Sequence, residues 1–248
     1  MKTGLVSVSF RDHTPEEIVG AALAAGLSAI EWGSDVHAPK GDRLRLEKTA
    51  ALCREQGVRV FSYGTYFRLG ETPFDQLNDY LDAAAILGAG VLRLWCGTKG
   101  YENYTPDEWQ MLITECRRAA ALAAEKKVTL CMECHQGTVT DCVEGALRLM
   151  REVDSSHFLM YWQPNQDKSV EENCRYAEKI APYTKAVHVF NWKGEDRLPL
   201  AEAVETWREY LKPFSKDITC LLEFMPDGRL ETLPREGQAL KTIVEENR

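Results

Sequence analysis

Long apolar runs are absent from this sequence, which excludes the simplest kinds of membrane protein. Nowhere do about 18 consecutive apolar residues occur, so no membrane-spanning helix is predicted. Charged residues appear within about ten residues of the first Met, which does not fit the apolar core of a signal peptide. We therefore expect a cytoplasmic protein.

An excess of basic residues is also lacking. The chain has 30 Lys and Arg against 38 Asp and Glu, a net charge of −8, and no local basic cluster. Such a chain repels polyanions, so neither nucleic acid nor an anionic membrane is expected as a partner. Without an export signal, the 8 cysteines are interpreted as reduced thiols rather than as a disulfide framework.

Short apolar runs, by contrast, alternate regularly with longer stretches of helical period. The runs predicted as strands are 4–10, 28–33, 58–64, 91–96, 128–135, 157–163, 185–191 and 219–225. Eight strand–helix units in 248 residues allow roughly 31 residues per unit, which leaves little beyond one strand, one helix and two loops. The predicted fold is a single (β/α)₈ TIM-barrel domain over residues 1–248.

Local signals agree with this alternation. Thr14-Pro15 and Thr105-Pro106 are typical of helix starts, and Gly26, Gly57 and Gly88 or Gly90 of helix ends. The alternative is a doubly wound open sheet. It would require a glycine-rich phosphate loop after the first strand, and SFRDHTPEE contains none.

Polar residues stand at the predicted carboxyl ends of four successive strands: Glu133, Gln163, His188 and Glu223. Active sites of such barrels lie at that end. Period-two alternation places Thr129, Cys131, Glu133 and His135 on one face of their strand, and Thr219, Leu221 and Glu223 on one face of theirs, opposite Cys220, Leu222 and Phe224. We therefore expect the four side chains to converge. The plainer alternative is that the glutamates pair with basic residues such as Arg93, which is itself expected to pair with Glu31.

With this series and the G-x-x-A-I-E segment at Gly26–Glu31, the chain resembles the sugar-phosphate isomerase/epimerase superfamily with the xylose-isomerase-like barrel. Its relatives include ketose 3-epimerases, hydroxypyruvate isomerase, inosose dehydratase and endonuclease IV. The resemblance implies a divalent metal held by Glu133, Gln163, His188 and Glu223, with Glu133 and Glu223 also moving protons. The family has aspartate where this chain has Gln163, and a histidine where it has Gln166.

The resemblance implies a metal-dependent isomerase or epimerase that acts through an enediolate on a small sugar, keto-polyol or hydroxy-keto acid. The ligand set suits Mn²⁺ or Mg²⁺, with Co²⁺ or Zn²⁺ as alternatives. Gln163 still offers a carbonyl oxygen but removes one negative charge, so metal affinity should fall. A metal-free, non-catalytic sugar-binding barrel is therefore the competing interpretation. An endonuclease IV-like enzyme is disfavoured by the 5 histidines and the acidic charge.

Further residues are candidates for contact with a carbohydrate substrate. His135 shares a face with Glu133, and aromatic rings near strand ends could stack on a sugar: Trp32, Trp95 and Trp192, with Tyr63 and Trp162 more weakly. Lys193 and Arg197 could hold a phosphate or carboxylate, although a solvated loop explains them equally well. His13 and His37 are interpreted as solvated loop residues. A homo-oligomer is compatible with this fold.

Overall fold

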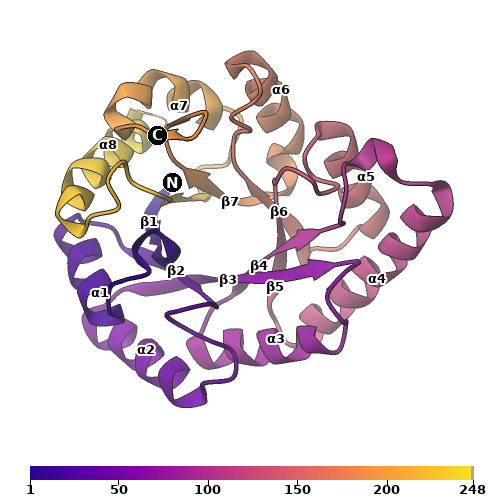
Figure 1. Cartoon of the computed structure of the whole chain (residues 1–248), viewed down its shortest axis with the longest axis horizontal. Coiled ribbons are helices and arrows are strands. Elements are labelled where there is room, and N and C mark those ends of the chain that lie inside the picture. The colour runs from indigo at the N-terminus through magenta and orange to yellow at the C-terminus, as the bar shows by residue number, and fades with distance from the viewer. Residues whose placement is uncertain (247–248) are drawn as a thin grey trace.

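Eight parallel strands form a closed barrel in the computed structural model, which describes residues 1–246 (Figure 1). Each strand pairs with the next in the chain, and β10 pairs with β1 to close the ring. The strands are β1 (Lys2–Val6), β2 (Ala29–Gly33), β3 (Arg59–Leu69), β4 (Val91–Cys96), β5 (Thr129–Glu133), β6 (Phe158–Trp162), β7 (Thr184–Val189) and β10 (Thr219–Leu222). The predicted barrel is confirmed, and the open sheet is excluded.

Helices follow the strands around the outside of the barrel (Figure 1). They are α1 (Pro15–Ala24), α2 (Arg43–Gln56), α3 (Gln76–Leu87), α4 (Pro106–Glu125), α5 (Val143–Val153), α6 (Val170–Ile180), α7 (Val204–Leu211) and α8 (Leu233–Glu246). Thr14 and Thr105 cap α1 and α4 in reciprocal capping boxes, as the Thr-Pro signals predict. Gly26, Gly57 and Gly88 have positive φ after α1, α2 and α3, so Gly88 rather than Gly90 ends its helix.

Strand boundaries differ most from the prediction at β1 and β3, while β5, β7 and β10 end two or three residues earlier than predicted. β1 ends at Val6 because the chain continues as a 3₁₀ turn, Ser7–Phe10, whose residues are also buried. β3 runs five residues further than predicted, to Leu69, and changes register against β4 after Gly64. The loop after β7 contains an unpredicted hairpin, β8 (Trp192–Lys193) paired with β9 (Asp196–Arg197).

Buried apolar residues form two layers, one inside the barrel and one between the strands and the helices. The inner cluster contains Cys131 and Leu221, and the outer one contains Leu130, Met132, Cys134, Cys220 and Leu222. The predicted alternation is therefore confirmed along β5 and β10. Phe224 is an exception: it packs against the inner cluster, because the strand ends at Leu222 and Phe224 turns with φ 51°.

The described residues contain no helix long and apolar enough to cross a membrane. The expected single domain includes residues 247 and 248, which lie outside the described part, and it stays a prediction.

Candidate active site

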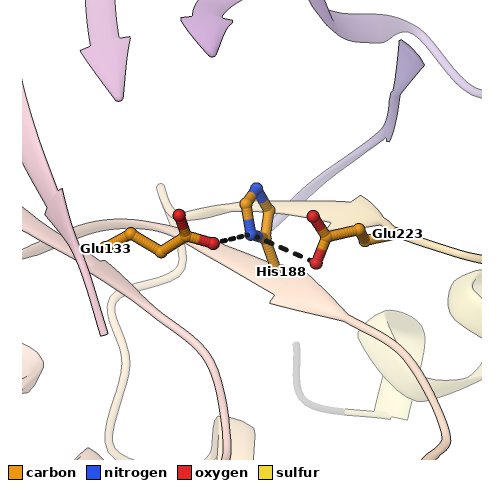
Figure 2. Close-up of side chains that lie close together, drawn as sticks. All are labelled: Glu133, His188 and Glu223. Atoms are coloured by element: carbon orange, nitrogen blue, oxygen red, sulfur yellow. Dashed lines mark ion pairs between the residues drawn. The ribbon is translucent and has the colours of Figure 1, made fainter. Parts of the chain in front are cut away.

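The four polar side chains predicted at strand ends meet around one atom, Nδ1 of His188. This atom lies 3.1 Å from Oε1 of Gln163, 3.3 Å from Oε1 of Glu133 and 3.5 Å from Oε2 of Glu223. In Figure 2 the two glutamates approach the imidazole from opposite sides. Parallel strands bring the four together, because β5, β6, β7 and β10 are successive neighbours and each contributes one residue at or just beyond its carboxyl end.

This arrangement fits one divalent cation. Ligand atoms bonded at about 2.1 Å to the same ion lie roughly 3 Å apart when they are adjacent, close to the separations found here. The possible ligand atoms of Glu133, His188 and Glu223 all lie within 4.8 Å of one another. Three oxygens and one imidazole nitrogen form a donor set for Mn²⁺, Mg²⁺, Co²⁺ or Zn²⁺, without the thiolates of a structural zinc site.

Arg93, on β4, connects two buried carboxylates at the base of the site. Its Nε lies 3.3 Å from Oε1 of Glu31, and its Nη1 lies 2.9 Å from Oε2 of Glu133. The same Glu133 oxygen accepts a 2.6 Å hydrogen bond from the indole of Trp95. The expected pairing of Arg93 with Glu31 is confirmed, and Arg93 also pairs with Glu133, as the plainer alternative expects of this glutamate.

Glycine makes room for this ion pair. A Cβ atom at Gly64, on β3, would lie 2.5 Å from Oε1 of Glu31 and 2.9 Å from Nη2 of Arg93, closer than real Cβ contacts. Glu31 also accepts a 2.7 Å hydrogen bond from Ser62 and lies 3.6 Å from Nε2 of His188. Glu31 therefore places a negative charge beside the His188 nitrogen that faces away from Glu133 and Glu223.

The charges of these groups shift one another's pKa. Burial raises the pKa of Glu31, but Arg93, His188 and Ser62 outweigh it and bring the value to about 2. Burial is likewise outweighed by Arg93 and His188 at Glu133, so its pKa lies far below the usual range. At Glu223 burial prevails and raises the pKa to about 7. Burial lowers the pKa of His188, but the carboxylates, Glu223 foremost, raise it to about 10. The site therefore attracts positive charge, and a proton would compete with any cation bound at His188.

A cavity of about 330 Å³ opens above these residues. Glu133, Glu223 and Gln163 line its floor, and Trp95, His135 and Trp192 line it as predicted, together with Tyr66, Phe190, Phe224 and Gln166. The His135 ring lies 5.0 Å from that of Trp95, and Trp192 lies 5.5 Å from Phe224. A small polar opening with aromatic walls suits a ligand that has both hydroxyl groups and C–H faces.

Three predicted substrate contacts do not line this cavity. Trp32 is fully buried in the outer layer against His37, because its neighbour Glu31 points into the barrel and consecutive strand residues face opposite ways. Lys193 lines a neighbouring cavity instead. The β8–β9 hairpin places the Arg197 guanidinium 4.4 Å from the Phe224 ring, and Arg197 is not a lining residue.

Other sequence interpretations are also corrected. His37 is not solvated: it is 2% exposed and contacts the Ser7 hydroxyl and the backbone oxygen of His13 at 3.1 Å each. Tyr63 and Trp162 lie in the outer layer. The sequence analysis missed Ser62 and Tyr161, whose hydroxyl oxygens lie 3.3 Å apart inside the barrel. Alternation along each strand with the neighbouring Tyr63 and Trp162, which face outward, was the available signal.

Comparisons with known proteins agree with this architecture. A model of the xylose isomerase-like TIM barrel family matches residues 19–215. The chain is 23% identical over 217 residues to 3-dehydroshikimate dehydratase from Bacillus anthracis, covering 82% of this chain and 76% of that protein.

Solved structures show the same barrel. The probable 3-DHS dehydratase AsbF from Bacillus anthracis matches with a TM-score of 0.79 and 17% identity, over 97% of this chain and 99% of that chain. The 3-keto-D-glucoside 4-epimerase YcjR from E. coli matches with a TM-score of 0.72 and 15% identity, over 97% of this chain and 98% of that chain. Because the family model covers most of the sequence and the fold is the same, this protein belongs to the xylose isomerase-like TIM barrel family.

Proposed function

We propose that this protein is a divalent-metal-dependent enzyme that enolises a small carbohydrate or a related hydroxy-ketone. The observation that carries the proposal is the convergence of Gln163, Glu133 and Glu223 on Nδ1 of His188, at the floor of a cavity. Mn²⁺ or Mg²⁺ suits these donors best. The dehydratase and epimerases among the similar proteins support a sugar-modifying reaction.

A bound divalent cation would supply Lewis-acid polarisation of a substrate carbonyl and stabilise the negative charge of its enolate. The protein's own residues do the rest. Trp95 and Trp192 orient the substrate and exclude water from the floor of the cavity. Glu133 and Glu223 are the carboxylates closest to the reacting atoms, and one or both exchange a proton with carbon. A neutral sugar fits the cavity, whose lining residue Arg11 is already bonded to Asp35 and Tyr66.

Metal binding tests this proposal directly. We expect isothermal titration to show one Mn²⁺ bound per chain, and His188→Ala to lose this binding while circular dichroism shows an intact barrel. His135→Ala is the matched control, because His135 lies at the cavity but 2 residues beyond the ligand Glu133 and contacts the Gln136 carbonyl instead. If the wild-type protein binds no divalent cation, the metal-free sugar-binding barrel becomes the better interpretation.

Two further predictions belong with this function. A cytoplasmic location and assembly into a homo-oligomer are both compatible with a sugar-metabolising barrel, and size-exclusion chromatography with light scattering measures the second.

A further inference from the structure

The two glutamates of the site differ in how many oxygens remain for a substrate. In Glu133, Oε2 accepts hydrogen bonds from both Trp95 at 2.6 Å and Arg93 at 2.9 Å. These two donors use both acceptor positions of that oxygen. Its other oxygen, Oε1, faces His188 at 3.3 Å and belongs to the proposed ligand set. Glu133 therefore has no oxygen left with which to take a proton from carbon.

Glu223 is placed differently. Its Oε2 lies 3.5 Å from Nδ1 of His188, on the ligand side. Within residues 1–246, no hydrogen bond is found to its second oxygen, Oε1, and the residue lines the cavity. One oxygen of Glu223 is thus available for the proposed metal, and the other for a substrate.

Stereochemistry follows from this difference. The two carboxylates approach from opposite sides of His188 (Figure 2), so a planar enolate bound between them would present one face to each. Inversion at carbon requires a proton to leave through one face and return through the other. With Glu133 held by Arg93 and Trp95, Glu223 is the one of these two carboxylates that is placed to accept or return a proton.

The geometry points to a one-base enzyme in which Glu223 alone exchanges a proton with the substrate and Glu133 serves as a positioning residue. This inference rests on the proposed function and narrows it to same-face reactions. They are isomerisation between adjacent carbons or syn elimination of water from a β-hydroxy ketone, rather than epimerisation.

Both reactions balance with Glu223 alone. Its carboxylate takes the proton from the carbon beside the carbonyl, and the electron pair of that C–H bond forms the C=C of the enolate. In isomerisation the hydroxyl proton on this carbon moves to the former carbonyl oxygen, a new C=O forms on this carbon, and the electrons of the C=C take the proton back from Glu223 at the former carbonyl carbon. In elimination the enolate electrons form a new C=C to the β-carbon, the C–O bond breaks, and the departing hydroxyl takes the proton from Glu223 and leaves as water.

The hydrogen bond from Trp95 to Glu133 is tested without substrate. The probe is the indole N–H resonance of Trp95 in ¹H–¹⁵N NMR spectra, which is assigned with the Trp95→Phe variant. We expect Glu133→Gln to shift this resonance upfield, because a neutral amide accepts a weaker hydrogen bond than a carboxylate. Glu223→Gln, the matched control, should leave it in place. An unchanged Trp95 resonance in Glu133→Gln would overturn the inference, whatever the activity.

The stereochemistry is tested with the Mg²⁺-loaded protein in D₂O, followed by NMR with D-fructose, D-tagatose, L-ribulose and 3-dehydroshikimate as probes. We expect Mg²⁺-dependent deuterium incorporation, isomerisation or elimination with at least one probe, and no inverted configuration at the exchanged carbon. Glu223→Gln should slow this exchange by about 10²–10⁴-fold. Formation of the epimer at the exchanged carbon would overturn the one-base inference but leave the proposed function standing. Absence of Mg²⁺-dependent exchange with every probe would instead reject the proposed function, and the inference with it.

Discussion

Replacing Arg93 by methionine removes the cation between two buried carboxylates. The Arg93 side chain contacts Glu31 at 3.3 Å and Glu133 at 2.9 Å, and the residue is only 4% exposed. Methionine keeps most of the length of the side chain but none of its charge. Removing one partner of a buried ion pair costs about 3–5 kcal/mol, because the remaining charge stays buried without compensation. Since two carboxylates depend on Arg93, we expect Arg93→Met to lose at least about 3 kcal/mol of unfolding free energy, or roughly 6–12 °C in melting temperature.

The pH dependence of this loss identifies its cause. Burial raises the pKa of Glu31, but Arg93 helps to lower it by more. The folded-state pKa is therefore about 2, below the unfolded value. A lowered carboxylate pKa contributes stability that is fully present above the unfolded pKa, about 4.3, and is lost as pH falls toward 2. Without Arg93, burial instead favours the protonated form of these carboxyl groups. Their contribution to the free energy of unfolding then falls as pH rises. The difference between wild type and Arg93→Met should therefore be large at pH 7 and smaller at pH 4.

Urea unfolding at pH 7 and pH 4 measures both quantities. Arg68→Met is the matched control: Arg68 stacks on Trp95 at 4.9 Å, but its partner carboxylate, Glu71, is 60% exposed. A pair of this kind contributes about 0–1 kcal/mol. If Arg93→Met loses less than its control at pH 7, or loses the same amount at both pH values, the charge of Arg93 is not what stabilises this part of the barrel.

Three other predictions concern the same site. Gln163→Glu keeps the side-chain shape but adds a negative charge near the proposed cation. It should tighten Mn²⁺ binding at least about tenfold and lower the melting temperature of the metal-free protein. Equal Mn²⁺ affinities of the two proteins, measured by titration, would place Gln163 outside the ligand set. Mn²⁺ binding should release about one proton at pH 8, because the carboxylates raise the pKa of His188 to about 10, and closer to two at pH 6, where Glu223, with a pKa of about 7, is also largely protonated. Titration in buffers of different ionisation enthalpy detects the release. Gly64→Ala should destabilise the protein by more than about 1 kcal/mol, because its Cβ would lie 2.5 Å from Glu31. Gly90→Ala is the control and should not, because a Cβ there would have no atom within 4 Å. Equal melting temperatures of the two variants would contradict this prediction.

The order of strands and helices was readable because each element carries its own signal. Apolar runs of strand length, Thr-Pro helix starts and glycines after helices recur with one spacing. Eight such units without a phosphate loop favour a closed barrel over an open sheet. The end of β1 was not readable. Ser7–Phe10 is as buried as the strand before it, so hydrophobicity alone cannot tell a 3₁₀ turn from continued strand.

Side-chain direction explains which site residues could be predicted. Alternation along β5 placed Glu133 with Cys131 inside the barrel, and the structure agrees. The same rule, applied to β2, would have placed Trp32 outside as soon as Glu31 was placed inside. Beyond the strand ends the rule no longer holds. Phe224 turns inward through a positive φ, and no signal in the sequence announced that turn.

Charge explains why a neutral side chain fits at position 163. Glu31, Glu133 and Glu223 bring three negative charges to the buried floor of the site, and Arg93 returns one positive charge. A divalent cation would balance the remaining two, and the amide of Gln163 would complete the proposed ligand set without adding charge that the buried site could not neutralise. An aspartate at this position would leave one negative charge unbalanced as long as Arg93 is present. Gln163 and Arg93 are therefore best understood together. Arg93, which holds Glu133, also supplies the positive charge that allows Gln163, just after β6, to be neutral.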